Sequence, residues 1–483
     1  TNMGKRDRQI LENVVIETVA AEGNALAHYE GRALFVPVCI PGDVVDVQIT
    51  HKRSSYMMGY VIRMVKPSPL RVEPFCSHFG DCGGCKWQPL PYEKQLEFKQ
   101  QQVIDQLSRI GKLDLPPISA ILGSELTTGY RNKLEFTFSN DRWKTFDQMK
   151  EETSADNTAP LLPSLGFHVS GRFDKVLDIE WCYLQDEPCN AIRLSVRDYA
   201  IKNDLSFFDL RAQTGFLRTL MIRITTTGQV MVVVVFAHDN PAKGENHDAR
   251  LRLMKHIKES FPGITSLQYI INAKKNDSFA DLPVVPYSGN AYITERMENL
   301  EFRIGPKSFY QTNSRQAYRL YDKVREMAQL NLSQHVYDLY TGTGTIALFL
   351  SGLCRRVTGI EYVPEAIEDA RENARINGIT NACFFAGDMK DILTPRFIAE
   401  EGRPDVVVLD PPRAGVHEDV LKVLMEAAPQ RIIYVSCNPA TQARDLRILS
   451  TMYRVTCVQP VDMFPHTHHV ENIVLAEKIP NTI

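Results

Sequence analysis

Long apolar runs and a strong net charge are both missing from this chain of 483 residues. No stretch approaches the roughly 20 consecutive apolar residues of a membrane-spanning helix, so the sequence predicts no membrane association. The opening residues, TNMGKRDRQILENVV, are charged and lack the apolar region of a signal peptide, so we expect a cytoplasmic protein. The net charge of -3 gives no global basic field of the kind that attracts nucleic acid.

Ten cysteines are present, and in a reducing compartment they indicate metal binding or catalysis rather than disulfides. Cys76, Cys82 and Cys85 follow a C-x5-C-x2-C spacing around two glycines, which let the backbone approach a ligand closely. This is not the C-x3-C-x2-C spacing of radical chemistry. Tetrahedral zinc and a cubane iron–sulfur cluster both need a fourth thiol, and the spacing does not distinguish the two.

Residues 1–68 are predicted to form a small β module. The segments NVVIETVA, ALFVPVCI and DVVDVQIT are short, rich in β-formers and separated by turns. Small barrels of this kind commonly bind oligonucleotides. Between Val47 and Val72 there is no acidic residue, and Tyr56 and Tyr60 are interleaved with five basic residues: Lys52, Arg53, Arg63, Lys66 and Arg71. The stretch favours a nucleic-acid platform, with a solvated basic face as the alternative.

Residues 69–300 are predicted to be a cysteine-bearing segment followed by a β-rich domain. YEKQLEFKQQQVIDQLSRIG has helical periodicity and a glycine stop at Gly111. From about residue 120 the pattern is mostly β, as in RTLMIRITTTGQVMVVVVFAH. The polar stretch 141–163 predicts an exposed loop, to which we assign no function.

Residues 301–483 alternate between strands and helices, which is typical of a doubly wound α/β domain. The predicted strands are HVYDLY, RVTGIEY, ACFFAGD, PDVVVLD, RIIYVS, RVTCVQPVD and ENIVLAEK. No internal repeat is present.

The ends of the first three strands carry a nucleotide-site pattern. Asp338 opens DLYTGTGTIAL, where Gly342 and Gly344 allow close backbone approach at a helix start. The stretch lacks the GKS/T of a Walker loop and the full GxGxxG of a dinucleotide site. Glu361 is placed to accept hydrogen bonds from a ribose diol, and Asp388 to lie near an adenine amino group. The ordered set favours an S-adenosylmethionine (SAM) methyltransferase, with another nucleotide-binding domain as the alternative.

The last strand ends carry the candidate chemistry. In VVLDPPRAG, Asp410 and two prolines precede Arg413, whereas nitrogen methyltransferases have a base-stacking aromatic there. The fifth strand ends at Cys437 in SCNP, which is either a core thiol or a group at the ligand-binding edge of the sheet. Near the C-terminus Glu471 follows three histidines that offer a metal site as an alternative: His466, His468 and His469.

Taken together, these motifs resemble one family over nearly the whole chain. They are the N-terminal TRAM-like barrel, the cysteine cluster, SFYQTN, DLYTGTG, LDPPRAG, SCNPAT and HHVENI. The chain resembles the RNA 5-methyluridine methyltransferases, and among them the iron–sulfur-containing 23S rRNA (uracil-5-)-methyltransferases. The resemblance implies methyl transfer from SAM to C5 of a uridine in folded RNA. It favours 23S rRNA, and tRNA stays open because related enzymes with the same modules act on it.

The resemblance also implies roles for particular residues. Cys437 would be the nucleophile that adds to uracil C6, and Glu471 would be the general base. Cys182, in IEWCYLQ, would complete the cysteine set with Cys189 as runner-up, and the set would hold a [4Fe–4S] cluster with zinc as the alternative. The SAM contacts would come from Gln311, Tyr340, Glu361 and Asp410.

Two other functions remain open at this point. A cytosine-C5 methyltransferase also uses a cysteine, but it is expected to carry a Pro-Cys motif where this chain has Ser-Cys-Asn-Pro. A non-catalytic RNA-binding or ribosome-assembly protein would have no need of both Cys437 and Glu471. Nothing in the sequence indicates an obligate protein partner.

Overall fold

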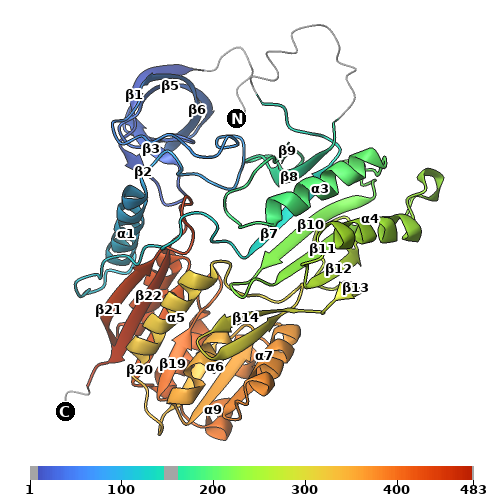
Figure 1. Ribbon diagram of the computed structural model, residues 1–483. Coiled ribbons are helices and arrows are strands. Elements are labelled where there is room, and N and C mark those ends of the chain that lie inside the picture. The colour runs from blue at the N-terminus through green and yellow to red at the C-terminus, as the bar shows by residue number, and fades with distance from the viewer. Residues whose placement is uncertain (1–8, 146–161, 481–483) are drawn as a thin grey trace.

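The computed structural model describes residues 9–145 and 162–480. Most of the predicted 141–163 loop therefore lies outside the described residues. The described N-terminal part is a six-stranded sheet in the order β1-β5-β6-β4-β3-β2, which curls into a ring at one end of the molecule (Figure 1). Its strands are β1 (Ile10–Val15), β2 (Thr18–Val19), β3 (Ala25–Tyr29), β4 (Arg32–Val36), β5 (Val44–Lys52) and β6 (Tyr56–Lys66). The predicted β module is present.

The cysteine-rich segment follows the ring and leads into helix α1 (Tyr92–Arg109), as the helical periodicity predicts. The helix begins after Pro91, which cannot donate a backbone hydrogen bond and suits a helix start. Its buried residues include Val103 and Leu107, which join a core cluster of the last sheet rather than of the central one. Helix α1 therefore connects the N-terminal half of the chain to the C-terminal sheet.

The central sheet has seven strands in the order β13-β12-β11-β10-β7-β8-β9. The sequence pattern predicts β structure here and does not predict two helices, α3 (Cys189–Lys202) and α4 (His247–Ser260), which pack on the apolar strands in one core cluster. A separate hairpin, β14 (Ile293–Met297) and β15 (Leu300–Ile304), follows. The strands of the sheet are β7 (Lys133–Ser139), β8 (Ser164–His168), β9 (Val176–Asp178), β10 (Leu217–Ile224), β11 (Val230–Phe236), β12 (Ser266–Ile271) and β13 (Val284–Gly289).

The C-terminal sheet also has seven strands, in the order β18-β17-β16-β19-β20-β22-β21. All pairs from β18 to β20 are parallel, and β22 is antiparallel to both β20 and β21. All seven predicted strands are present: β16 (His335–Leu339), β17 (Arg356–Glu361), β18 (Ala382–Ala386), β19 (Val406–Leu409), β20 (Arg431–Ser436), β21 (Tyr453–Val461) and β22 (Glu471–Lys478).

Helices cover both faces of this sheet, which confirms the doubly wound α/β domain. One face packs against α5 (Ser314–Ala328), α6 (Thr345–Leu350) and α7 (Pro364–Ile376), seen in front of the strands in Figure 1. Residues from α1 and four further helices pack on the other face: α8 (Met389–Ile392), α9 (Pro395–Glu401), α10 (Glu418–Ala427) and α11 (Pro439–Leu449).

The strand order reverses at β16, which lies between β17 and β19. In open α/β sheets ligands bind in the crevice at the carboxyl ends of the strands where the order reverses. Among the described residues, no helix has both the length and the apolar character needed to cross a bilayer.

Candidate active site

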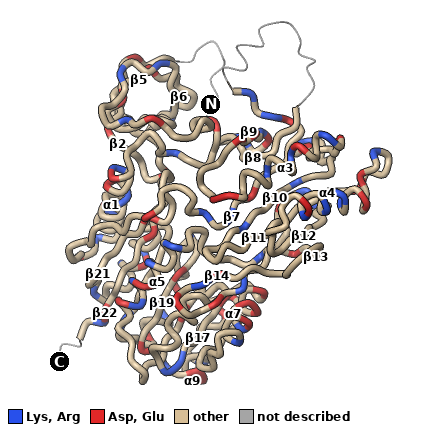
Figure 2. Tube along the Cα trace, in the orientation of Figure 1, with Lys and Arg blue, Asp and Glu red and all other residues tan. Residues whose placement is uncertain are grey.

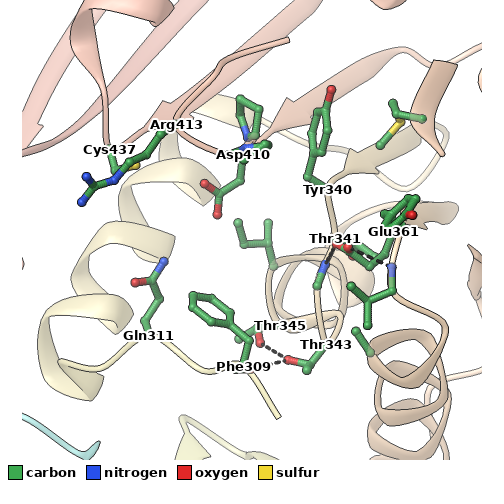
Figure 3. Close-up of a pocket in the computed structure, with 18 of the residues that line it drawn as sticks. Phe309, Gln311, Tyr340, Thr341, Thr343, Thr345, Glu361, Asp410, Arg413 and Cys437 are labelled. Atoms are coloured by element: carbon green, nitrogen blue, oxygen red, sulfur yellow. Dashed lines mark hydrogen bonds between the residues drawn. The ribbon is translucent and has the colours of Figure 1, made fainter. Parts of the chain in front are cut away.

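A large cavity of about 1590 Å³ opens at the carboxyl ends of the C-terminal sheet. Figure 3 shows part of its lining, with Gln311, Tyr340, Glu361, Asp410 and Cys437 converging from different elements. The structure brings eight of the ten predicted catalytic and cofactor residues to this one cavity: Gln311, Tyr340, Gly342, Glu361, Asp388, Asp410, Cys437 and Glu471.

The glycine-rich turn after β16 takes the conformation that its sequence predicts. Gly342 has φ of +57°, in the left-handed region that glycine adopts without steric cost. Its backbone N–H donates to Glu361 Oε2 at 2.9 Å, which fixes the carboxylate at the end of β17. Tyr340 also has a positive φ, +63°, so the turn directs this side chain into the cavity at some conformational cost.

Asp338 and Gly344 lie outside the cavity lining, unlike the other predicted cofactor residues. Asp338 is fully buried and accepts a hydrogen bond from Thr341 Oγ1 at 2.7 Å, so it shapes the turn from behind. A Cβ on Gly344 would come within 2.9 Å of Ala370 Cβ, so this glycine permits the approach of α7. Both residues support the turn, and their predicted contacts with SAM stay predictions.

Three ionisable groups meet at the ends of β19, β20 and β22. Burial and the nearby Asp338 raise the pKa of Asp410 to about 7, and burial and Asp410 raise the pKa of Glu471 to about 8. Burial and Glu471 raise the pKa of the Cys437 thiol to about 11. Arg413 opposes the last two shifts because its cation favours the charged forms. Perturbed groups in a cleft are the usual mark of a reactive site.

Three side chains in this cavity were not predicted from the sequence. The sequence shows Arg413 only in place of the base-stacking aromatic of nitrogen methyltransferases and predicts no role for it. In Figure 3 its side chain extends beside Cys437. Phe309, in the SFYQTN motif, is 63% exposed and Tyr362, next to Glu361, is 70% exposed, although both line the cavity. The sequence could have indicated both rings, because Phe309 lies close to Gln311 and Tyr362 follows Glu361, two residues predicted to bind SAM. Exposed rings in a concave site are suited to stacking on planar ligands.

A second cavity, of about 680 Å³, is lined by all four predicted cysteine ligands: Cys76, Cys82, Cys85 and Cys182. The runner-up Cys189 is only 1% exposed and is absent from the lining. Gly83 lies close to the backbone of residue 168, since a Cβ there would come within 2.9 Å of the His168 carbonyl. The backbone N–H of Gly84 donates to Cys82 Sγ at 3.4 Å. The segment therefore folds tightly around its thiols.

The chemistry of this second cavity fits a thiolate-bound cationic group. Burial raises the pKa of Cys82 to about 12 and that of Cys85 to about 11, and it also raises the pKa of Cys182. A metal reverses this cost, because coordination removes the thiol proton. Arg131 and Lys86 also line the cavity and supply positive charge for a group with four thiolates.

Neither the cysteines nor the histidines form a compact single-ion site. In residues 9–145 and 162–480, no group of three or more His, Cys, Asp or Glu side chains is arranged to hold one metal ion. Glu471 lines the large cavity, whereas His466, His468 and His469 do not. The rings of His468 and His469 pack against each other, with their centroids 4.2 Å apart. The histidine metal site considered from the sequence has no support in this arrangement.

The basic stretch of the N-terminal sheet is only partly free to bind a ligand. Arg63 pairs with Asp46 at 2.6 Å, and Arg71 pairs with the buried Asp43 at 2.5 Å. Along β6 a row of exposed side chains remains: Tyr56, Met58, Tyr60, Ile62 and Met64. Figure 2 shows the two signs of charge interspersed over the described chain, in keeping with the small net charge.

Comparison with known proteins agrees with this geometry. Residues 290–479 match the family model described as tRNA (Uracil-5-)-methyltransferase. An uncharacterized RNA methyltransferase of Bacteroides thetaiotaomicron is 56% identical over 95% of this chain and 100% of its own length. One of Chlorobaculum tepidum is 39% identical over 93% of this chain and 92% of its own length.

A solved structure extends the similarity to the whole fold. The crystal structure of Pyrococcus abyssi tRNA (uracil-54, C5)-methyltransferase in complex with S-adenosyl-L-homocysteine has a TM-score of 0.73 and 28% identity. The match covers 97% of this chain and 100% of that one. With close relatives along nearly its full length and a matching family model over the sheet that carries the cavity, the chain belongs to the RNA uracil-5-methyltransferase family.

Proposed function

We propose that this protein methylates C5 of a uridine in RNA, with SAM as the methyl donor and Cys437 as a covalent nucleophile. The observation that carries the proposal is the convergence of Cys437, Glu471 and Asp410 in the cavity that also holds Glu361. The matching family model concerns uracil-5 methylation, and the Pyrococcus abyssi relative acts on a tRNA uracil. A non-catalytic RNA-binding protein would not need this set.

The chemistry explains why a cysteine is needed. Uracil C5 is too weak a nucleophile to take a methyl group unaided, so the Cys437 thiolate adds to C6 and turns C5 into an enolate carbon. C5 then attacks the methyl group. Glu471 removes the C5 proton, the C5=C6 bond reforms, and the C6–S bond breaks to return the thiolate. The target base must leave its stack in the RNA to reach the thiol.

The SAM subsite is assigned to the strand ends on the β16–β18 side. Glu361 would accept hydrogen bonds from the ribose of SAM, and Asp388 would face its adenine amino group. Gln311 and Tyr340 border the same space. Pockets for one drug-sized ligand measure roughly 300–1,000 Å³, so a cavity of about 1590 Å³ leaves room for both SAM and an extruded nucleotide.

The raised pKa values suit the order of the steps. The sulfonium of SAM is cationic, so its binding favours the ionised forms of Asp410, Glu471 and Cys437. Methyl transfer removes that charge. Burial and Asp410, which raise the pKa of Glu471, are then no longer opposed by the sulfonium charge. Glu471 is therefore most basic when it must take the C5 proton.

The test of this function separates adduct formation from release. Cys437→Ala is expected to abolish both methylation and any covalent RNA complex, whereas Cys383→Ala, at a half-buried thiol outside the cavity, should change neither. RNA containing 5-fluorouridine should trap the wild type, because fluorine cannot leave as a proton does. Normal turnover by Cys437→Ala would overturn the proposal and return this thiol to a packing role.

We further propose that Cys76, Cys82, Cys85 and Cys182 hold a [4Fe–4S] cluster. Each thiolate of a cubane binds a different iron atom, so its ligands lie farther apart than the four ligands of one zinc ion. Four thiols spread around one 680 Å³ cavity suit the larger group. Anaerobically purified protein should contain iron and sulfide, and stoichiometric zinc without iron would contradict the assignment.

RNA binding is assigned to residues 1–68, as a TRAM-like module, and to the central part, residues 69–300, with residues 301–483 as the catalytic domain. The sequence resemblance favours 23S rRNA as substrate. The Pyrococcus abyssi relative favours tRNA as the second candidate. Mapping 5-methyluridine in total RNA from cells with and without the gene decides between them, because each predicts loss of the mark from a different RNA. A cytoplasmic location suits both substrates.

A further inference from the structure

The loop between β21 and β22, residues 462–470, leads directly into Glu471. His466 in this loop has φ of +67°, a left-handed conformation that is uncommon for residues other than glycine. Such a conformation persists only where surrounding contacts impose it. The source of those contacts therefore determines what holds Glu471 in place.

The contacts to His466 come from the cysteine-rich segment and α1. The backbone N–H of His466 donates to Gln95 Oε1 at 2.8 Å, and Gln95 Nε2 lies 3.1 Å from His466 Nδ1. The His466 carbonyl accepts from the backbone N–H groups of Lys86 at 2.9 Å and Trp87 at 3.1 Å. Gln95 is itself fully buried and also donates to the Trp87 carbonyl at 3.0 Å. The left-handed residue is thus held from the other half of the chain.

A buried ion pair fixes the start of the same loop. Lys99 Nζ lies 2.6 Å from Asp462 Oδ1, and both side chains are 0% exposed. Tyr92 donates its hydroxyl to Asp462 Oδ2 at 2.7 Å, and Lys99 donates also to the Phe464 carbonyl at 3.1 Å. A buried pair adds little net stability over an apolar packing, but it favours one arrangement, because a displaced partner leaves a buried charge uncompensated.

The loop also touches the lining of the cysteine cavity. The rings of Phe75 and His466 pack edge to face, with centroids 4.9 Å apart. Phe75 precedes Cys76, Lys86 follows Cys85, and both line that cavity. Contacts from this lining reach His466, and Glu471 follows five residues later in the chain.

We propose that Gln95 and Lys99 are positioning residues that set Glu471 for removal of the C5 proton, and that Phe75 and Lys86 tie this step to the cysteine cavity. The inference rests on the proposed function. In the affected step, the C5–H electrons form the C5=C6 bond and the C6–S pair returns to Cys437 as thiolate, while Glu471 takes the proton. None of the hydrogen bonds and ring contacts described above involves Cys437, which lies between β20 and α11. Its addition to C6 and the methyl transfer are therefore separable from release.

The experiment uses the full-length protein, its RNA substrate and SAM with a labelled methyl group. Gln95→Leu, Lys99→Met and Phe75→Leu are compared with Gln101→Leu, which alters an exposed residue of the same helix. In the first three, the first methyl transfer should proceed at close to the wild-type rate. Release should be about 100-fold slower, the loss typical of a 1 Å misplacement, so that methylated RNA–protein adduct accumulates on denaturing gels.

Equal slowing of transfer and release in these variants, or no accumulated adduct, overturns the inference. Phe75 is 38% exposed, so Phe75→Leu keeps the test decisive if a variant at the buried Gln95 or Lys99 fails to fold. The behaviour of the wild type distinguishes failure of the proposed function from failure of the positioning role. A wild type that forms no adduct and no 5-methyluridine refutes the proposed function, whereas a working wild type with proportionally slowed variants refutes only the positioning role.

Discussion

Replacing Glu471 with glutamine isolates the last chemical step. Burial and Asp410 raise the pKa of Glu471 to about 8, so at pH 7 only about one-tenth of this group is a carboxylate. In the proposed mechanism, release of the RNA requires the Glu471 carboxylate. The wild-type release rate should therefore rise about tenfold between pH 7 and pH 9 and then level off. Glu471→Gln should release the RNA about 10²- to 10⁴-fold more slowly, the usual contribution of a general base, and show no such rise with pH.

The assay forms the adduct in a single turnover with labelled SAM and follows its decay on denaturing gels. Glu418→Gln is the matched control, because this carboxylate lines the same cavity but has a side chain that is 64% exposed. Glu418→Gln should keep the wild-type pH profile. Wild-type release that does not vary with pH, or a Glu471→Gln variant that slows methyl transfer as much as release, would refute this account of the base.

Three further outcomes are expected. The carboxyl of Glu471 has a raised pKa, so it binds a proton more tightly in the folded state. Its contribution to stability is therefore present at low pH and lost as the pH rises toward 8. Glu471→Gln should raise the melting temperature at pH 9 and leave it nearly unchanged at pH 4. Replacing Lys52 and Arg53 with alanine should weaken RNA binding and flatten its salt dependence by about 0.7 to 0.9 for each phosphate that is no longer neutralised; an unchanged slope would mean a merely solvated face. Cys182→Ser should lower the iron content of anaerobically purified protein while Cys189→Ala should not, and the reverse result would reassign the fourth ligand.

The positions of site residues can be predicted from the sequence where the local pattern and the order of the strands determine them. Four strands of the C-terminal sheet, β16, β17, β19 and β20, end at or next to Asp338, Glu361, Asp410 and Cys437, so period and turn chemistry bring these residues to one edge. Whether a residue of such a motif lines the cavity or is buried behind it is harder to predict. Asp338 sits in the same motif as Tyr340, but only the folded turn shows that one is buried behind the cavity and the other lines it.

The central helices illustrate a different limit. In α3, the buried residues Ile192, Val196 and Ala200 recur every four positions, which is a helical period. Long apolar strands lie on both sides of this segment in the sequence, so the overall pattern predicts β structure and hides the helix. Contacts such as Gln95 with His466 leave no local signal at all, because each residue is an ordinary polar side chain until the other is beside it.

The contact between Gln95 and His466 joins residues 371 positions apart, which bears on how the protein is made. A ribosome adds about 5–20 residues per second, so the second residue of this pair emerges about 20 to 75 s after the first. Strand β22 is the last strand in sequence, yet it is inserted between β20 and β21. A chain that stops before residue 471 lacks both Glu471, the proposed general base, and the strand that pairs with β20 and β21. The C-terminal sheet therefore cannot be completed until β22 has been made, and chains truncated shortly before Glu471 should show no methyl transfer.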